Sequence, residues 1–339
     1  MAIDKTAYSP REFQFLFGGQ EAWNTQLLTA LYALDVDSVG FPSFGTTQVL
    51  DVRAGSRVLQ ATDLFQTQAA SVTEIAVSGT LKDNTGRFLL ANITGDTSGE
   101  YAVQSNYGDT TGLTAYGVGT SGLTASHFKL LTIVYSSPQT DTDLVFEDCV
   151  CTAFSLNGDM GTEAGRVKFS ATFKTGTKPH DLSLTSESVD SAISTGEDVS
   201  MTTWSDSDYR QICGKNGLIV NTFALNLEND AIFTGIDSNG NFEAVTRASE
   251  FSATADFNVK YDSKTESMIS AWQTQTGDSG TTIMNNDAAP TNETFGFKMV
   301  KSAYTNAAYS EGDIMNMDVS VKALGSGNTS AAALVEIAI

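Results

Sequence analysis

The sequence contains few of the residues from which disulfide frameworks, metal sites and nucleophilic centres are built. Among its 339 residues there are three cysteines and two histidines. An odd and small number of cysteines makes no disulfide framework. Cys149 and Cys151 stand at i and i+2 of a predicted strand, but tetrahedral zinc sites commonly use two ligand pairs, and no second pair follows. We therefore expect no metal site and interpret both thiols as small side chains within a strand.

Basic residues and long apolar runs are also scarce. The chain has 19 lysines and arginines against 40 acids, a net charge of −21. Such a surface repels nucleic acid at long range, because phosphate binding depends on basic side chains. No stretch of 18 apolar residues is present, and the first residues, "MAIDKTAYSPREFQF", lack the basic and apolar regions of a signal peptide. We expect synthesis in a cytoplasm, no membrane contact and no conventional role in DNA binding.

Three short patterns resemble chemical motifs, and each lacks the context that its chemistry requires. Residues 117–122, "GVGTSG", are followed by a predicted strand, whereas a dinucleotide motif opens a helix. Residues 237–243 alternate oxygen-bearing side chains, but their glycine is misplaced for a calcium loop. His180 has Asp181 and Ser183 nearby without a nucleophile elbow. We predict no catalytic residue and no cofactor, and therefore a protein that is not an enzyme.

What the chain does contain is typical of short strands joined by turns. Glycine, serine and threonine are abundant, only five prolines occur, and 41% of the residues are hydrophobic. Apolar residues occupy alternate positions over 143–156 and again over 167–173, the period of a half-buried strand. These patterns predict a mainly β fold with one short helix per domain.

Similar patterns recur along the chain, which indicates two tandem domains. The segments 127–137 and 296–306 both contain Phe-Lys and, further along at the same spacing, Tyr. Predicted strands at 71–83 and 249–262 are each followed by a short helical pattern that ends in Thr-Gly-Asp. We predict an N-terminal arm over 1–22, a first domain over 23–178, a polar linker over 179–203 and a second domain over 204–339.

Each predicted domain also contains a long insertion after its first strand, over 44–70 and 229–248. Loops of this length are uncommon unless they bind something or form a projecting hairpin. Asn239-Gly240 is a strong hairpin turn signal, so we predict a hairpin in the second insertion.

The duplicated order of strand, insertion, strand, helix and further strands resembles the tail tube proteins of long-tailed bacteriophages. The resemblance covers about two thirds of the chain. It is carried by "LDVDSVGFPS" (34–43), "VLDVRAGSRV" (49–58), "TLKDNTGRFLLANITGD" (80–96) and "FEDCVCTAFSLNGDMGTEAGRVKFSATFKTG" (146–176) with their partners in the second half.

The resemblance implies a barrel-forming β-sandwich in each domain and a self-assembling structural protein of the virion tail. A chain with two such domains would close a ring as a trimer with pseudo-sixfold symmetry, and rings would stack into a tube. The implied partners are further copies of the chain and other tail proteins at the tube ends. DNA would pass through the lumen without specific binding, and the acidic composition predicts an acidic lining of that lumen.

In this family the long insertion contacts the next ring, which assigns ring stacking here to 44–70 and 229–248. The alternative is that both insertions fold back on their own domain. Two other classes stay open for the whole chain, a carbohydrate-binding or adhesin-like β-protein and another structural component of a virion. The residues assigned to the contact between rings are Arg53, Arg57, Phe65, Phe233, Phe242 and Arg247.

Overall fold

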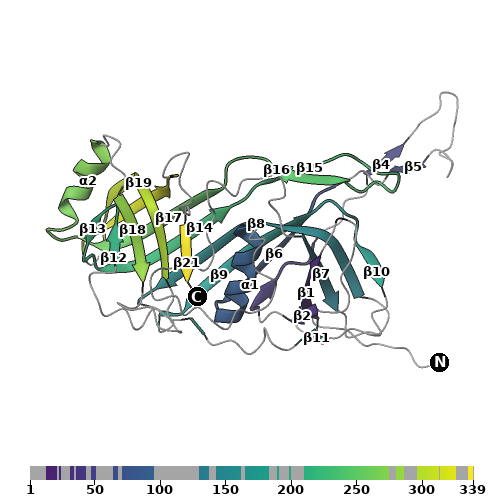
Figure 1. The fold of residues 1–339 in the computed structure, drawn as a ribbon, viewed down its shortest axis with the longest axis horizontal. Coiled ribbons are helices and arrows are strands. Elements are labelled where there is room, and N and C mark those ends of the chain that lie inside the picture. Colours follow the sequence, from purple (N-terminus) through teal and green to yellow (C-terminus); the bar gives the residue numbers. More distant parts are fainter. Residues whose placement is uncertain are drawn as a thin grey trace.

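The computed structural model of the chain confirms a mainly β protein (Figure 1). Two helices occur among the residues that the structure describes, and strands make up most of the rest. The described residues are 13–20, 23, 31–33, 36–42, 47–50, 64–67, 71–94, 130–136, 143–161, 165–182, 189–190, 198–199, 210–274, 280–285, 296–312, 314–325 and 335–338.

The described elements fall into two consecutive sets. The N-terminal set contains β1 (Gln14–Gln20), β2 (Leu31–Ala33), β3 (Ser38–Val39), β4 (Thr47–Leu50), β5 (Leu64–Thr67), β6 (Thr73–Thr80), α1 (Asp83–Thr94), β7 (Leu130–Ser136), β8 (Asp143–Asp159), β9 (Val167–Thr175) and β10 (His180–Leu182). The short strand β11 (Val189–Asp190) follows and pairs with β2. The C-terminal set contains β12 (Arg210–Ile212), β13 (Lys215–Asn216), β14 (Val220–Glu228), β15 (Ala231–Thr234), β16 (Ala244–Arg247), β17 (Ser252–Lys260), α2 (Glu266–Gln273), β18 (Gly280–Asn285), β19 (Gly296–Ser310), β20 (Asn316–Ala323) and β21 (Val335–Ala338).

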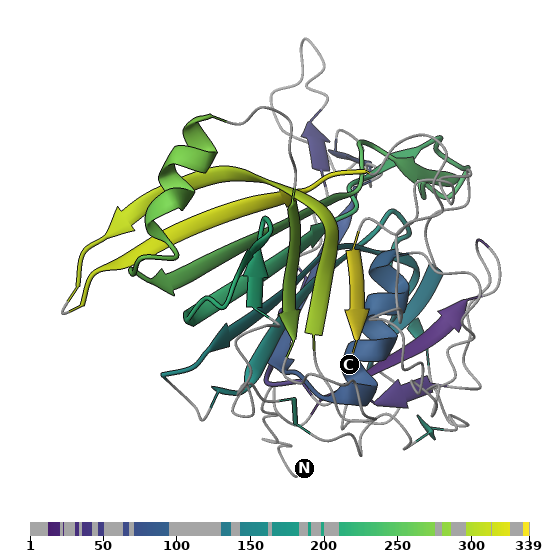
Figure 2. The ribbon, with the colours of Figure 1, turned by 60° about the vertical axis from the view of Figure 1, so that its left-hand side comes forward.

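Eight antiparallel strands form one long sheet that runs through both sets. Their order is β3-β6-β9-β8 and then β14-β17-β20-β19. The pairing of β8 with β14 joins the two sets into a continuous sheet. Figure 2 shows β19 and β20, in yellow-green, reaching beyond the other strands at one end of this sheet. The predicted boundaries between domains stay a prediction, because the backbone ladder crosses from one set to the other without interruption.

A second layer covers the apolar face of the long sheet. In the N-terminal set, β2, β1, β7, the first part of β8 and β10 form this layer. The ring of Phe17 on β1 lies 5.2 Å from that of Phe173 on β9, measured between centroids, so the two layers meet in the core. Helix α1 closes the same core with Phe88, Leu89 and Ile93, which repeat at helical spacing and are buried.

The two sets repeat the same pairing, strand by strand. β7 pairs with β8 through an irregular step in which Leu131↔Cys149 is followed by Ile133↔Phe146. β18 pairs with β19 through the same step, with Gly280↔Ser302 followed by Thr282↔Met299. A second bulge, between Cys151 and Ala153 of β8, has its counterpart between Tyr304 and Asn306 of β19. Because bulges are specific local features, their coincidence fixes the equivalence of the two sets residue by residue.

This equivalence corrects the register of the repeat expected from the sequence. The shared bulges make β8 the counterpart of β19, with Cys151 equivalent to Tyr304. The segment 296–306 therefore matches β8 rather than β7, and the counterpart of β7 is β18, a strand that the repeat did not predict. Alternation with period two is common to all strands, so similar letters matched one strand to its neighbour.

Part of the predicted N-terminal arm is an integral strand. Residues 14–20 form β1, which pairs with β7 along its whole length and is buried from Phe15 to Gln20. Phe15 and Phe17 contribute rings to the core, so this stretch is ordered by the chain's own packing. Residues 1–12 of the predicted arm lie outside the described part.

Candidate assembly interface

The junction between β8 and β14 is the centre of the candidate site. Seven consecutive residue pairs join the strands, from Thr222↔Asp159 to Glu228↔Ala153. On the inner face Leu225 lies opposite Leu156, and both side chains are fully buried. Burying a leucine contributes about 1.5–3 kcal/mol, so apolar packing and the backbone ladder together hold the two sets in this register.

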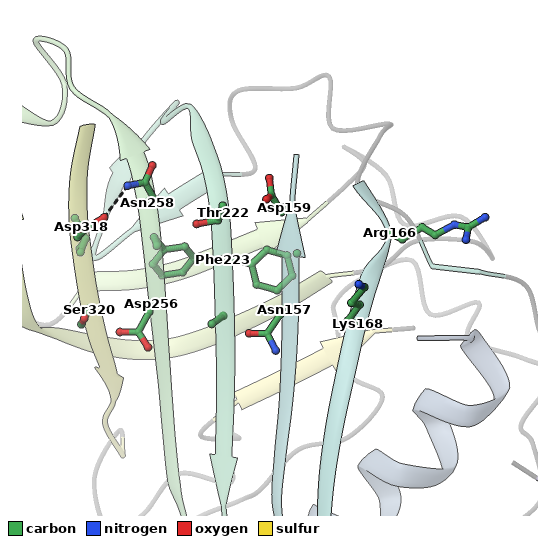
Figure 3. A pocket seen from close by; sticks show the side chains of 14 residues that line it. Asn157, Asp159, Arg166, Lys168, Thr222, Phe223, Asp256, Asn258, Asp318 and Ser320 are labelled. Carbon is green, nitrogen blue, oxygen red and sulfur yellow. Dashed lines mark hydrogen bonds between the residues drawn. The ribbon is translucent and has the colours of Figure 1, made fainter. Parts of the chain in front are cut away.

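The outer face of the junction is a polar groove (Figure 3). The groove has a volume of about 470 Å³ and crosses β9, β8, β14, β17 and β20. Its side chains are mostly short and polar, and they bond from strand to strand: Asn258 Nδ2 donates to Asp318 Oδ1, and Asn221 Nδ2 donates to Asn258 Oδ1 at 2.9 Å. Its two phenylalanines, Phe223 and Phe257, are only 3% exposed, so the groove presents no aromatic platform.

The outer face carries charges of both signs. Alternate residues of the long sheet point to this face, away from the core. Arg166, beside the groove, adds a base that pairs with Asp198. The charged residues that β6, β8, β9, β14, β17 and β20 contribute to this face are five acids, Glu74, Asp159, Glu228, Asp256 and Asp318, and four bases, Lys168, Lys174, Lys260 and Lys322.

Both ends of the long sheet have edges that correspond to the two sides of the junction. β3 is the counterpart of β14, and the second part of β19 is the counterpart of β8. Within the described residues no strand pairs with the outer side of β3 or with that of 306–310. The stretch Asn306-Ala307-Ala308-Tyr309-Ser310 contains neither charge nor proline, the usual features that protect a free edge.

Two exposed aromatic residues occupy these edges at the positions of the buried leucine pair. Because Tyr304 is equivalent to Cys151, Tyr309 takes the position of Leu156. The pairing of β3 with β6 likewise places Phe41 at the position of Leu225. Tyr309 is 51% exposed and Phe41 is 50% exposed, whereas both leucines are inaccessible. Each edge thus presents a large apolar side chain where the internal junction buries one.

The hairpin β15–β16 packs against the N-terminal set of its own chain. Its strands pair from Ala231↔Arg247 to Thr234↔Ala244. Phe242 N–H donates to the carbonyl oxygen of Gly176 at 3.1 Å, and Lys178 N–H donates to Asn241 Oδ1 at 3.0 Å. A Cβ atom at Gly176 would lie 2.6 Å from the Phe242 ring and 2.8 Å from the Phe233 ring. Glycine at 176 is therefore what allows the two rings to approach.

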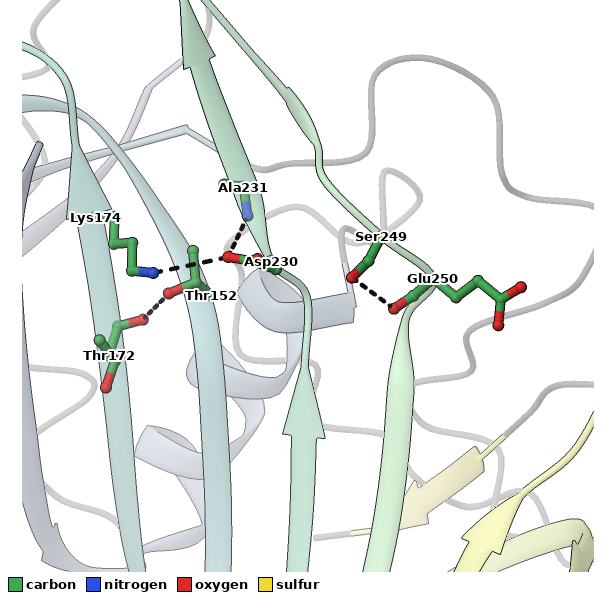
Figure 4. A network of polar contacts seen from close by, with 7 residues as sticks. All are labelled: Thr152, Thr172, Lys174, Asp230, Ala231, Ser249 and Glu250. Carbon is green, nitrogen blue, oxygen red and sulfur yellow. Dashed lines mark hydrogen bonds and ion pairs between the residues drawn. The ribbon is translucent and has the colours of Figure 1, made fainter.

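Polar contacts anchor the base of this hairpin (Figure 4). Asp230 pairs with Lys174 of β9 at 3.7 Å and accepts a hydrogen bond from Ala231 N–H at 3.0 Å. Asn229 is fully buried, donates through Nδ2 to the carbonyl oxygen of Ile93 and accepts from Arg247 Nε at 2.7 Å. Partial burial lowers the pKa of Arg247, which stays a cation at neutral pH.

The six residues assigned to a contact between rings divide into two groups. Phe233, Phe242 and Arg247 all contact other parts of their own chain. The hairpin packs on the N-terminal set and not on its own predicted domain, and the contact of 229–248 with another ring stays a prediction. Arg53 and Arg57 lie outside the described residues, and of Phe65 only the backbone in β5 is described. The first insertion also forms a hairpin, with Thr47↔Thr67 and Val49↔Phe65 as pairs.

The thiols occupy packed positions. Cys149 and Cys151 are fully buried in the core, and desolvation raises the pKa of each well above its ordinary value. Cys213 is half-buried beside Ser302, with Sγ 3.4 Å from Oγ. Within the described residues no group of three or more possible metal ligands occurs. His180 is part of β10, and residues 117–122 lie outside the described part.

Sequence reasoning missed Phe41, Tyr309 and Gly176. Phe41 precedes Pro42, and Tyr309 ends a run of small residues, so neither lies in a clear alternating pattern. Gly176 stands in a polar turn, where glycine is common for other reasons. The roles of these three residues depend on which strands are neighbours in the sheet. The only sign of this in the sequence was the repeat of similar patterns in its two halves.

The comparisons with known proteins add no family. No protein-family model matches this chain, and its sequence matches no curated protein. Among the described helices, neither combines the length and the apolar character needed to cross a bilayer.

Proposed function

We propose that the protein is a structural subunit of a phage tail that joins copies of itself edge to edge into rings, which stack into a tube. The observation that carries this proposal is the internal junction of β8 with β14. The outer sides of their counterparts, β19 and β3, pair with no strand among the described residues and lie at opposite ends of the same sheet. The edge at one end of the sheet is complementary to the edge at the other end, so copies of the chain associate head to tail. Such association closes into a ring or continues as a helix.

The register of the proposed contact follows from the internal one. Thr222↔Asp159 predicts Ser38 opposite Gly312 of the next copy, and Ala224↔Asn157 predicts Gly40 opposite Ser310. Tyr309 then lies opposite Phe41, so the two exposed aromatics bury each other as Leu156 and Leu225 do. Aromatic pairs across strands stabilise by about 0.2–1 kcal/mol beyond the burial of their area.

Ring size supports a channel rather than a filled core. Each copy contributes eight strands to the long sheet, so three copies contribute about 24. With strands about 4.8 Å apart and tilted by about 35–45°, such a barrel is roughly 45–50 Å across. Barrels of 16–18 strands already leave an aqueous channel.

The polar outer face of the sheet suits a lumen that lets DNA pass. Its acids and bases alternate with short Ser, Thr and Asn side chains and make no basic patch among the described residues. Without clustered lysines and arginines, phosphate binding gains little from counterion release. We therefore infer that DNA passes because the lumen is polar and binds phosphate weakly, and not because an acidic lining repels it.

A carbohydrate-binding role receives less support from the same face. Sugar stacking needs exposed aromatic rings, and the two rings that line the groove are buried. A structural role in another part of a virion shares the edge contacts proposed above, and the shape of the assembly distinguishes it.

The test is the assembly state of the purified protein. We expect rings with a central channel in negative-stain micrographs, and a mass of about three copies by mass photometry. Tyr309→Lys places a charge at the edge and should leave monomers, while the matched control Ser320→Lys, on the outer face, should still assemble. Monomers of the unmodified protein at high concentration and moderate salt would overturn the proposal, and closed shells would favour another virion component.

A further inference from the structure

The two hairpins occupy equivalent places in the two sets. β4–β5 follows β3 as β15–β16 follows β14, and the pair Val49↔Phe65 corresponds to Phe233↔Val245. Figure 1 shows β15 and β16 along the upper edge of the molecule with β4 and β5 beside their far end, and β15–β16 packs on the turn after β9 through Phe233 and Phe242. The two hairpins therefore differ in the part of the molecule on which each of them lies.

β15–β16 covers the turn that follows β9 in the preceding set of strands. That turn begins at Gly176, and its counterpart after β20 begins at Leu324. In one chain β4–β5 cannot reach Leu324, because β3 and β19 are the two opposite ends of the eight-stranded sheet. An equivalent contact would therefore form only between one copy and the next.

The residues at the two contacts are complementary in size. Gly176 accommodates Phe233 and Phe242, whose rings would collide with any side chain at that position. Leu324 replaces the glycine and is 39% exposed, while Val49 takes the register position of Phe233. A larger residue in the turn thus accompanies a smaller residue on the hairpin, as close packing of the same contact requires.

We propose that β4–β5 of each copy docks on the Leu324–Gly325 turn of its neighbour in the same ring and clasps the edge junction from outside. This inference rests on the proposed ring assembly and deepens it. It assigns the first hairpin to a lateral contact within a ring, in place of the contact between rings that the resemblance implies. The occupant is a second copy of this chain, and the exposed Leu324 is the apolar anchor that the hairpin covers.

Engineered disulfides test the clasp separately from the ring, in a Cys213→Ser background. Gly40→Cys with Ser310→Cys reports the edge junction, because residues opposite each other on antiparallel strands lie within disulfide range. Val49→Cys with Leu324→Cys reports the clasp. The matched internal control is Ala224→Cys with Asn157→Cys, which should close within one chain and leave its mass unchanged on a non-reducing gel.

If both reporters give covalent multimers under oxidation, the ring and the clasp are supported. Multimers from the 40–310 pair alone, together with an unchanged concentration midpoint of assembly for Leu324→Asp, would overturn the clasp and leave the ring standing. Absence of multimers from both pairs in a protein that stays monomeric would overturn both. We expect Leu324→Asp to raise that midpoint about tenfold without altering the thermal unfolding of the monomer.

Discussion

The outer edges of the sheet are equivalent in position to the two strands of the internal junction, but the junction is paired and the edges are exposed. At the junction β8 and β14 are paired and Leu156 and Leu225 are fully buried. At the edges the equivalent positions hold Tyr309 and Phe41, each about half exposed. Tyrosine has a polar hydroxyl at the end of its ring, so Tyr309 tolerates water in the free subunit better than a leucine would. The difference shows that the internal contact belongs to the folded subunit, whereas the equivalent positions at the edges are exposed in it.

Breaking the internal junction should have the largest effect on the subunit. Leu225→Ala removes a buried side chain and leaves a cavity, so we expect the free energy of unfolding to fall by about 2–5 kcal/mol. The matched edge variant Phe41→Ala should cost less than about 1 kcal/mol in the monomer, because its side chain is half exposed. Urea unfolding of both variants measures the difference. Equal losses would show that the edge is already part of the core of the free subunit.

Alkaline pH should destabilise the subunit through its thiols, two of which lie in the N-terminal set and one, the half-buried Cys213, in the C-terminal set. Cys149 and Cys151 are buried in the N-terminal set, and their counterparts are Ser302 and Tyr304. Burial raises the pKa of each thiol, so the native state keeps protons that the unfolded state loses above about pH 8.5. Stability is therefore complete below that pH and falls as pH rises, by up to about 1.4 kcal/mol per pH unit for each thiol.

Urea unfolding between pH 7 and pH 10 measures this slope. Cys149→Ser should reduce the slope by about a third above pH 8.5, because burial raises the pKa of Cys151 and Cys213 as well. An unchanged slope in that variant would assign the pH dependence to other groups. Tyr135 and Tyr304, whose pKa values burial also raises, add to it only above about pH 10.

Changing the turn under the second hairpin should have an intermediate effect. Gly176→Leu makes this turn like its counterpart at Leu324, and its Cβ would collide with Phe233 and Phe242. We expect a loss of about 1–3 kcal/mol and faster proteolysis within 235–243, because the hairpin is displaced. Adding Phe233→Val, the residue type of the first hairpin, should restore part of the loss. No recovery in the double variant would argue against complementary sizes at the two contacts.

Removing the ion pair at the base of the hairpin should have the smallest effect. Lys174→Gln deletes the contact with Asp230, whose side chain is 58% exposed. Such pairs contribute about 0–1 kcal/mol, so the change should be within that range and should shrink further at high salt. Thermal unfolding at low and high salt measures it, with Lys322→Gln, exposed on the same face of the sheet, as the control. A loss of several kcal/mol would show that Lys174 supports the hairpin through packing.

Much of the local structure was accessible from the sequence. Alternation over 143–156 predicted the strand observed as β8, and the short helical pattern that ends in Thr-Gly-Asp after the strand at 71–83 predicted α1. Asn239-Gly240 predicted the turn between β15 and β16, and Gly240 has the positive φ of +77° expected for such a turn. Each of these signals is contained in a few neighbouring residues.

The candidate interface was harder to predict from the sequence, because the role of each of its residues depends on the residues beside it on neighbouring strands. The pattern over 296–306 was correctly a strand, but it was matched to the wrong member of the first set, and β18 was missed. Phe233, Phe242 and Arg247 were singled out as contact residues, and their partners are in the same chain. Arg53 and Arg57 stay predictions.

Local periodicity and composition were enough to establish a β-rich, duplicated chain with a short helix and a long insertion in each half, since strands, helices and tight turns are specified over a few residues. The order of strands in the sheet, the union of both halves through β8 and β14 and the matching free edges emerged only from the folded chain. The ladder partners Leu156 and Leu225 are distant in the sequence, and period two is alike in every strand, so only packing of the whole core selects which strands meet.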